Sequence, residues 1–432
     1  MKDTVHTHEE IDVLKACRNR ISFIFDNFEK VCLSFSGGKD STVLAHLIAE
    51  ECRRRSRKCG MLIVDLEAQY AETMRFVDAI VRKYDDVYET YWVCLPLHLR
   101  NAVSVFEPQW VCWDKEQRQK WVREYPNSPH VVNDQSFFPF YKYAMEFEDF
   151  VAYFSDWYAG GTLTASVVGI RTQESLNRWK AIHRWNSNIF LNKKFLNIQS
   201  DTVINAYPIY DWVTEDVWKY IGEYNLEYNR IYDLMYQAGR SIHECRICQP
   251  YGDDQRRGLD LFRKVEPETW AKVVNRVQGA NFGNIYCGTH LLGNNKVILP
   301  PGMTWRKFYE FLLQTIPRWQ AEWYKHRVSM YMQNWSARFE KYMSENIYKY
   351  EGADRKAIED FAARWRKDID VPIEDRIRDE EDPKVEGFQL APSYRRITRC
   401  VYRNDLVMFG LGMGRVKDLY YTLNEFKRKY GE

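Results

Sequence analysis

The stretch Val31-Cys32-Leu33-Ser34-Phe35-Ser36-Gly37-Gly38-Lys39-Asp40-Ser41 joins a short β-prone run to a pair of glycines and a charged, hydroxyl-rich turn. Apolar residues then recur at helical spacing over residues 43–48. This order predicts a strand, a tight loop and a helix. Backbone N–H groups exposed at the start of such a helix favour an anion such as phosphate.

The loop contains residue types that suit a bound nucleotide. Its glycines let the backbone turn sharply and approach a ligand closely. Lys39 adds a positive charge, and Asp40 suits the Mg²⁺ that accompanies ATP, because Mg²⁺ prefers carboxylate and phosphate oxygens. The other nucleotide ligands expected in the loop are Ser36, Gly37, Gly38 and Ser41. The Walker A spacing is absent, and an ordinary helix-capping turn is the alternative.

Further strands and helices alternate along the first half of the chain. Apolar runs predict three more strands, at residues 61–65, 91–95 and 165–170. Helical spacing is found in residues 11–29, 71–83 and 214–224. The alternation predicts an α/β fold with a doubly wound, mostly parallel sheet. An aromatic-rich helical region is expected to follow it.

We expect four segments. These are an α/β domain (1–240), a Cys/His-containing segment (241–300), a helical region (301–367), and a linker with a basic C-terminal tail (368–432). Residues 110–140 are expected to be an insertion with a helix near 113–124. In the tail, residues 399–402 are predicted to be β-prone, and its Lys and Tyr residues favour a solvated helix face over a contact with nucleic-acid backbone.

Composition excludes several classes of protein. The 62 basic and 60 acidic residues give a net charge of +2, so net charge does not indicate nucleic-acid binding. The polar start MKDTVHTHEEID is unlike a signal peptide, and the apolar runs are too short to cross a bilayer. The ten cysteines are therefore expected to be reduced thiols of a cytoplasmic protein without membrane contact.

Four ordered motifs together resemble one family. The loop resembles the PP-loop of the adenine nucleotide α-hydrolase (HUP-like) superfamily, in its phosphoadenylylsulfate (PAPS) reductase branch. Three later stretches fit the same branch: Asp65 with Glu72-Thr73, Gly169-Ile170-Arg171 with Glu174-Ser175 and Arg178, and Tyr207-Pro208-Ile209-Tyr210-Asp211-Trp212 with Glu215-Asp216-Val217-Trp218. The resemblance spans about residues 20–250.

The resemblance implies an ATP pyrophosphatase or adenylyltransferase. The loop would grip the β,γ-pyrophosphate of ATP, with Lys39, Asp40 and Arg171 as catalytic residues. Arg171 and Arg178 could hold a phosphate or an anionic substrate by paired hydrogen bonds, and a surface ion pair is the alternative for each. Asp65 could meet the ribose or the metal, or cap a helix.

A second cysteine-containing feature follows the α/β region. Cys245 and Cys248 form a C-x₂-C pair, and Cys287 and His290 a C-x₂-H pair, which together make a workable tetrahedral zinc set. An iron–sulfur cluster with His243 as a spare ligand, a redox dithiol and simply buried thiols are the alternatives.

The remaining motifs resemble a particular subgroup of this family but do not identify the reaction. Residues 246–254, 279–283 and 392–397 resemble the bacterial subgroup typified by the immunoglobulin-binding regulator A protein, which is often paired with a ParB-like partner. The C-terminal E-C-G-[LI]-H motif of PAPS reductases is only faintly echoed at residues 286–290. Three functions therefore remain open: ATP pyrophosphatase in nucleic-acid modification or phage defence, sulfonucleotide reductase, and nucleotide-sensing scaffold.

Overall fold

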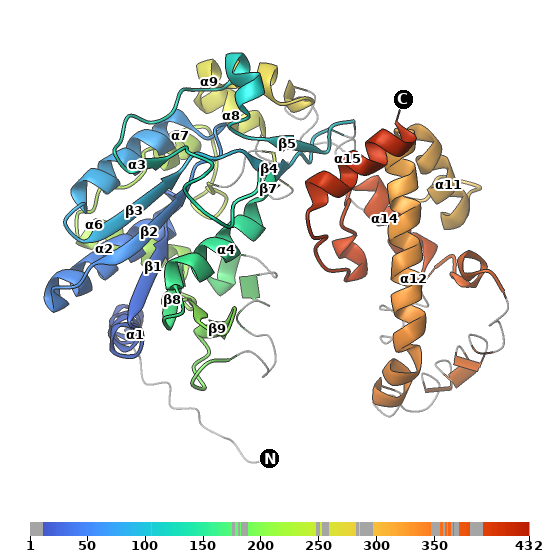
Figure 1. The fold of residues 1–432 in the computed structure, drawn as a ribbon, viewed down its shortest axis with the longest axis horizontal. Coiled ribbons are helices and arrows are strands. Elements are labelled where there is room, and N and C mark those ends of the chain that lie inside the picture. The colour runs from blue at the N-terminus through green and yellow to red at the C-terminus, as the bar shows by residue number, and fades with distance from the viewer. Residues whose placement is uncertain are drawn as a thin grey trace. The chain divides into compact units, whose positions relative to one another are not determined.

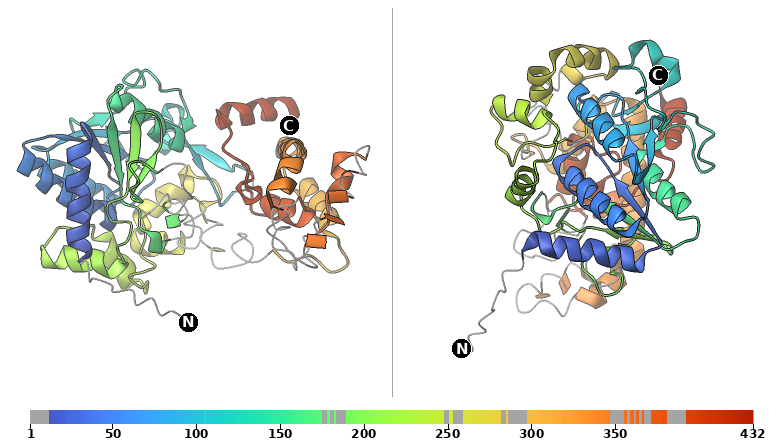
Figure 2. Two further views of the ribbon diagram at one scale, coloured as in Figure 1. Left: turned by 90° about the horizontal axis from the view of Figure 1, so that it is seen from below. Right: turned by 90° about the vertical axis from the view of Figure 1, so that its left-hand side faces the viewer.

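The computed structural model describes residues 12–104, 106–174, 178–179, 182, 189–247, 251–252, 259–281, 285, 297–346, 355–356, 359–360, 362–363, 366, 371–380 and 392–431. The chain divides into two compact units (Figures 1 and 2). The first contains residues 1–99 and 110–280, and the second contains residues 100–109 and 281–432. Among the described residues, every helix is too short or too polar to span a bilayer.

The first unit alternates strands and helices. Its strands are β1 Lys30–Ser34, β2 Cys59–Val64, β3 Tyr88–Val93, β4 Leu97–Arg100, β5 Gln109–Val111, β6 Val131–Val132, β7 Met145–Glu146, β8 Thr164–Val168, β9 Leu196–Ile198 and β10 Val203–Ala206. Its α-helices are α1 Val13–Asn27, α2 Lys39–Arg55, α3 Ala71–Lys83, α4 Phe147–Ala159, α6 Thr214–Glu223, α7 Ile231–Gln237, α8 Leu259–Val265 and α9 Pro267–Arg276. Short 3₁₀ helices are η1 Lys115–Lys120 and η2 Thr172–Glu174.

The main sheet confirms the predicted fold class. In the described part of the chain it has seven strands in the order β6-β3-β2-β1-β8-β10-β9. Each pair of neighbours is parallel except β10 and β9. The chain proceeds from β1 to β2 and β3 on one side and later returns to β8 on the other. The carboxyl ends of β1 and β8 therefore flank a topological switch point, where open α/β sheets bind ligands.

Helices cover both faces of this sheet. Cys59 of β2 contacts Cys52 of α2, with 3.2 Å between the two Sγ atoms. The next residue, Gly60, faces Tyr158 of α4, whose ring would lie 2.7 Å from an added Cβ. Successive strand residues point to opposite faces, so α2 and α4 lie on opposite sides of the sheet.

The second unit is helical. Its elements are α11 Trp305–Thr315, α12 Arg318–Asn346, η6 Ile373–Arg376, α14 Tyr394–Tyr402, η8 Phe409–Leu411 and α15 Leu419–Tyr430. Its core is rich in aromatic residues, including Trp305, Trp323 and Tyr324. The aromatic-rich helical region is therefore confirmed, and α15 bears out a helix in the basic tail.

Two local predictions were wrong. Residues 399–402 are not a strand but the end of α14, whose N-cap Ser393 accepts a hydrogen bond from Arg396 N–H. Buried Tyr394, Ile397 and Val401 recur every three to four residues along it, so helical periodicity overrode the local β propensity. The helix expected near 113–124 is only η1, and Gln117 inside it has non-helical dihedral angles.

Candidate nucleotide site at the ends of β1 and β8

The loop between β1 and α2 has the tight backbone that its glycines allow. Gly37 lies at φ 73°, and a Cβ there would come within 2.8 Å of Val77 Cγ2 on α3. Left-handed φ and close packing both require glycine at this position. Gly38 is the N-cap of α2 and provides no side-chain cap, so the first N–H groups of the helix depend on other partners.

The two loop serines are bonded within the loop. Ser41 Oγ donates to Gly38 O at 3.0 Å and lies 3.2 Å from Ser36 Oγ. Ser36 is exposed, whereas Lys39, Asp40 and Ser41 are buried. In the part of the chain that the structure describes, the N–H groups of Asp40 and Ser41 have no protein acceptor. Two donors at a helix N-terminus are therefore available to an anion.

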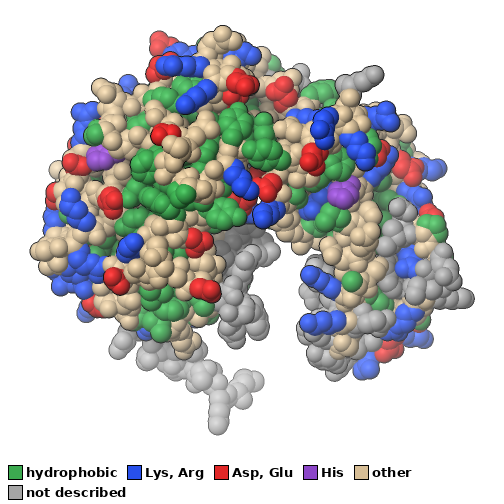
Figure 3. Space-filling view, viewed as in Figure 1, with side chains coloured by type: hydrophobic (Ala, Val, Ile, Leu, Met, Phe, Trp, Pro, Cys, Tyr) green, Lys and Arg blue, Asp and Glu red, His purple; other side chains and the backbone are tan. Residues whose placement is uncertain are grey.

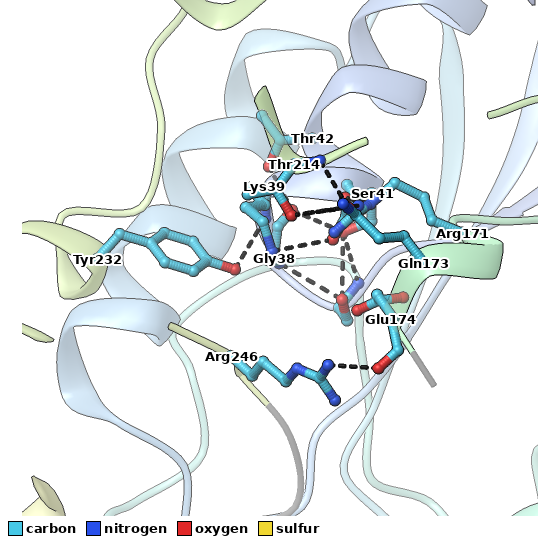
Figure 4. Close-up of polar contacts among 12 residues, drawn as sticks. Gly38, Lys39, Ser41, Thr42, Arg171, Gln173, Glu174, Thr214, Tyr232 and Arg246 are labelled. Atoms are coloured by element: carbon cyan, nitrogen blue, oxygen red, sulfur yellow. Dashed lines mark hydrogen bonds and ion pairs between the residues drawn. The ribbon is translucent and has the colours of Figure 1, made fainter. Parts of the chain in front are cut away.

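Two cations, Lys39 and Arg171, converge on Asp40 beside these amides. Figure 4 shows both side chains at the start of α2. Lys39 Nζ lies 3.2 Å from Asp40 Oδ2, and Arg171 Nε lies 2.5 Å from Asp40 Oδ1. Arg171 is only 1% exposed. Gly169 directly follows β8 and allows the backbone there to lie close to the start of α2, because a Cβ at this position would lie 3.2 Å from Ser41 N. The structure thus brings together the three residues predicted to be catalytic.

Gln173, which follows β8, and Thr214, the first residue of α6, hold Arg171 in place. Arg171 Nη1 donates to Gln173 Oε1 at 3.2 Å and to Thr214 Oγ1 at 3.4 Å. Gln173 Oε1 also accepts from Thr214 N–H at 2.9 Å. The guanidinium is therefore oriented by a polar network as well as by Asp40, and its plane is fixed before any ligand arrives.

The region around α7 holds the loop from the other side. Asn229 Nδ2 donates to Gly37 O at 3.1 Å and to Thr73 Oγ1 at 2.9 Å. The Tyr232 hydroxyl accepts from Lys39 N–H at 3.0 Å, and Lys39 Nζ lies 5.4 Å from the centre of the Tyr232 ring. Side chains almost 200 residues away in the sequence therefore fix the loop conformation.

Arg178 and Arg246 lie around Glu174. Arg178 forms an ion pair with the Glu174 carboxylate, and its own side chain is 43% exposed. Arg246 donates to Glu174 O (Figure 4). In the structure, Arg178 is therefore paired with a carboxylate. Its contact with a nucleotide stays a prediction.

Asp65 is fully buried just after β2. Its carboxylate accepts from Trp92 Nε1 at 3.0 Å and from Glu67 N–H at 3.0 Å, and forms an ion pair with Arg123. The N-cap of α3 is Tyr70, so the helix-capping alternative for Asp65 was wrong.

The cysteine motif is described only in part. Cys245 is 2% exposed, and burial raises the pKa of its thiol above the ordinary value, against the opposing effect of the Lys39 ammonium. The other predicted ligands, Cys248, Cys287 and His290, lie outside the described residues. Within the described residues, no group of three or more His, Cys, Asp or Glu side chains could hold a metal ion.

The motif around Asp211 and Trp212 has a structural contact. Arg20 of α1 forms two hydrogen bonds with the Asp211 carboxylate, at 2.7 and 2.5 Å, and Trp212 Nε1 donates to Val13 O at 3.3 Å. These contacts fasten α1 to the segment before α6.

Sequence reasoning missed the residues that support the loop and Arg171: Gln173, Thr214, Asn229 and Tyr232. None belongs to a glycine-rich or metal-type pattern. Gln173 and Thr214 do adjoin the motifs at Arg171 and Glu215, so those motifs were the only sequence signal for them.

The comparisons with known proteins agree with this fold. The phosphoadenosine phosphosulfate reductase domain model matches residues 30–239, and the Domain of unknown function (DUF3440) model matches residues 239–420. The first unit thus contains a PAPS reductase-like domain with the adenine nucleotide α-hydrolase fold.

One relative shows the family. The uncharacterized protein YbdN of Escherichia coli is 37% identical over 327 residues, which cover 74% of this chain and 80% of YbdN. The chain therefore belongs to the family of YbdN and combines a PAPS reductase-like domain with the DUF3440 region.

Two further matches are more distant. Adenosine 5'-phosphosulfate reductase 2 of Bacillus subtilis is 23% identical over 251 residues, which cover 58% of this chain and 84% of that protein. The structure of phosphoadenylyl-sulfate (PAPS) reductase from Candida auris in a phosphate complex is 15% identical and has a TM-score of 0.30. That match covers 50% of this chain and 84% of the other.

Proposed function

We propose that this protein binds ATP at the β1–α2 loop and cleaves it between the α- and β-phosphates, transferring the adenylyl group to an acceptor. The observation that carries the proposal is the pair of buried cations, Lys39 and Arg171, held beside open helix amides at the switch point of the sheet. Such a site stabilises negative charge on phosphate oxygens.

The residues of the site would act by electrostatic stabilisation. The nucleophilic atom of the acceptor attacks the α-phosphorus, and the bond from that phosphorus to the bridging oxygen breaks. Pyrophosphate leaves with the electron pair of that bond. Lys39 and Arg171, released from Asp40, would bind the developing charge on the pyrophosphate, and the N–H groups of Asp40 and Ser41 would donate to the same oxygens.

Magnesium fits this site only through an exchange of partners. Asp40 is the one carboxylate that the loop itself supplies, and both of its oxygens carry cationic partners. When the cations turn to the phosphates, Asp40 becomes available as a Mg²⁺ ligand. The bound ion would neutralise charge on the triphosphate.

A second metal is part of the proposal. The buried Cys245 thiol and the sequence spacing of Cys248, Cys287 and His290 support a zinc site or an iron–sulfur cluster. The buried position of Cys245 fits a ligand that is shielded from solvent. Metal analysis of the pure protein tests this, and protein without zinc or iron would refute it.

Sulfonucleotide reduction is the second candidate. The similarity to adenosine 5'-phosphosulfate reductase 2 favours it, because the match covers most of that relative's length. It requires a nucleophilic cysteine, and Cys287 is the residue we propose. Sulfite release from PAPS that is abolished in Cys287→Ser would support this candidate.

The cellular role follows only from the family resemblance. We propose a role in nucleic-acid modification or phage defence, alongside a ParB-like partner, in the subgroup that includes the immunoglobulin-binding regulator A protein. A nucleotide-sensing scaffold would use the same loop without turnover.

The products from labelled ATP separate these functions. With ATP labelled at the α-phosphorus, Mg²⁺ and a cell extract as the source of acceptor, we expect labelled AMP or an adenylylated acceptor together with pyrophosphate. Asp40→Ala should abolish both products. Formation of ADP and phosphate, or no turnover with extract and partner present, would contradict the proposal.

A further inference from the structure

The side chain of Tyr232 lies against the 36–41 loop (Figure 4). It is 4% exposed. Its hydroxyl oxygen accepts from Lys39 N–H at 3.0 Å. The hydroxyl also lies beside Gly38, since a Cβ added there would be in ordinary van der Waals contact with it, at 3.4 Å. The ring is held edge-on by Trp218 of α6, with 5.4 Å between the ring centres.

The hydroxyl proton of Tyr232 is not used within the described part of the protein. In every hydrogen bond that the described residues make with this hydroxyl, Tyr232 is the acceptor. A phenol can also donate one hydrogen bond, and a buried donor without an acceptor destabilises a folded protein. The unused proton lies beside Lys39 and the N–H groups that start α2, where negative charge is expected.

We propose that the Tyr232 hydroxyl donates to an oxygen of the pyrophosphate part of the bound nucleotide while it continues to accept from Lys39 N–H. This inference rests on the proposed function, because it assigns a further ligand to the same nucleotide. The hydroxyl thereby connects the first amide of α2 to the phosphate through one additional hydrogen bond.

Two properties of the residue support this role. Burial raises the pKa of Tyr232 above its ordinary value, so the group stays protonated and neutral and does not repel a phosphate. The Lys39 ammonium lies over the ring, so a movement of Lys39 towards the phosphate would leave the hydroxyl close to the same oxygens. A purely structural cap would need only the acceptor function.

Tyr232→Phe tests the donor, since it keeps the ring and removes the hydroxyl. We expect the Kd of the full-length protein for ATP and for inorganic pyrophosphate, measured by calorimetry with Mg²⁺, to rise about tenfold or more, the usual effect of losing a hydrogen bond to a charged group. The upward shift of Tm caused by ATP should shrink accordingly.

The matched control is Tyr228→Phe. Tyr228 packs on the same Trp218, but its hydroxyl donates to Asp233. We expect this variant to bind both ligands like the wild type. Wild-type affinity for pyrophosphate in Tyr232→Phe, with only a lowered Tm, would overturn the inference and leave the proposed function intact. A wild-type protein that binds neither ligand would overturn both.

Discussion

The carboxyl ends of β1 and β2 both carry a buried acid paired with an arginine, yet their surroundings differ. After β2, Glu67 accepts two hydrogen bonds from Arg276, at 2.8 and 3.1 Å, and further bonds from the N–H groups of Trp113 and Val122. After β1, the Asp40 carboxylate is bonded, among the described residues, only to the side chains of Lys39 and Arg171, next to amides that lack acceptors there.

We interpret this difference as one between a structural ion pair at Glu67 and the proposed nucleotide-binding cluster at Asp40. The Glu67 carboxylate has four donors, and these connect Trp113 and Val122, within the insertion at 110–140, to α9. Such a group has no remaining capacity for a ligand. The charges around Asp40 are paired mainly with each other, in a near-neutral protein whose acidic and basic side chains are interspersed on the visible face of the first unit (Figure 3). In the proposed function they exchange partners when a phosphate binds.

Glu67→Gln should have the largest effect on stability. It leaves the Arg276 guanidinium buried without a counter-charge, so we expect the free energy of unfolding to fall by about 3–5 kcal/mol. Urea denaturation measures this. The exposed pair of Arg53 and Asp86 is the matched control, and Asp86→Asn should cost less than about 1 kcal/mol. Equal losses in the two variants would contradict the distinction.

Arg171→Lys should affect turnover more than folding. The charge remains, but the planar fork that contacts Asp40 and Gln173 is lost, so we expect the rate of AMP formation to fall about 100-fold. Arg178→Lys provides the comparison, because Arg178 is half exposed and paired with Glu174. If Arg178→Lys lowers the rate as much, the phosphate contacts extend beyond the Asp40 cluster.

Gly37→Ala should disturb the loop through strain and packing together. We expect a loss of about 1–3 kcal/mol in the free energy of unfolding and weaker ATP binding. Gly161 has a similar dihedral angle, φ 84°, but a Cβ added there would meet no atom within 4 Å. Gly161→Ala therefore measures the effect of backbone strain without that of packing. ATP binding should be unchanged in Gly161→Ala. A Gly37→Ala variant with wild-type ATP affinity would show that this backbone does not form the phosphate site.

His46→Gln should have a smaller effect, on the pH dependence of stability. His46 lies on α2, away from both acid–arginine pairs. Burial lowers the pKa of His46 below 6.5, and its Nδ1 lies 2.8 Å from the Tyr220 hydroxyl. The unfolded chain therefore takes up this proton first, and stability falls as pH drops below about 6.5. The urea midpoint should decline less between pH 7.5 and 5.5 in His46→Gln than in wild type. Parallel pH profiles for the two proteins would refute this.

The sequence was sufficient for the parts of the site that adjoin a strand end. The loop and Arg171 follow β1 and β8 directly, and helix α3 spans the predicted residues 71–83. The local sequence pattern was enough to predict these elements, because hydrophobic periodicity and glycine positions indicate short-range structure.

The sequence was insufficient where contacts depend on the tertiary fold. Asn229 and Tyr232 reach the loop only because α7 packs beside it, and neither stands in a distinctive pattern. The contact of Asp211 with Arg20 of α1 could not be predicted from the sequence either, since the two residues lie 191 positions apart. Propensity misassigned residues 399–402 because the periodicity of α14 was stronger.

We propose that the cluster of Lys39, Asp40 and Arg171 binds the triphosphate, whereas the Glu67–Arg276 pair does not. A crystal structure with α,β-methylene-ATP and Mg²⁺ tests it most directly. We expect the β- and γ-phosphates on the 36–41 loop, with Arg171 or Lys39 turned from Asp40 to a phosphate oxygen and Glu67 still bonded to Arg276. A nucleotide bound elsewhere, or a saturated crystal without nucleotide at this loop, would contradict it.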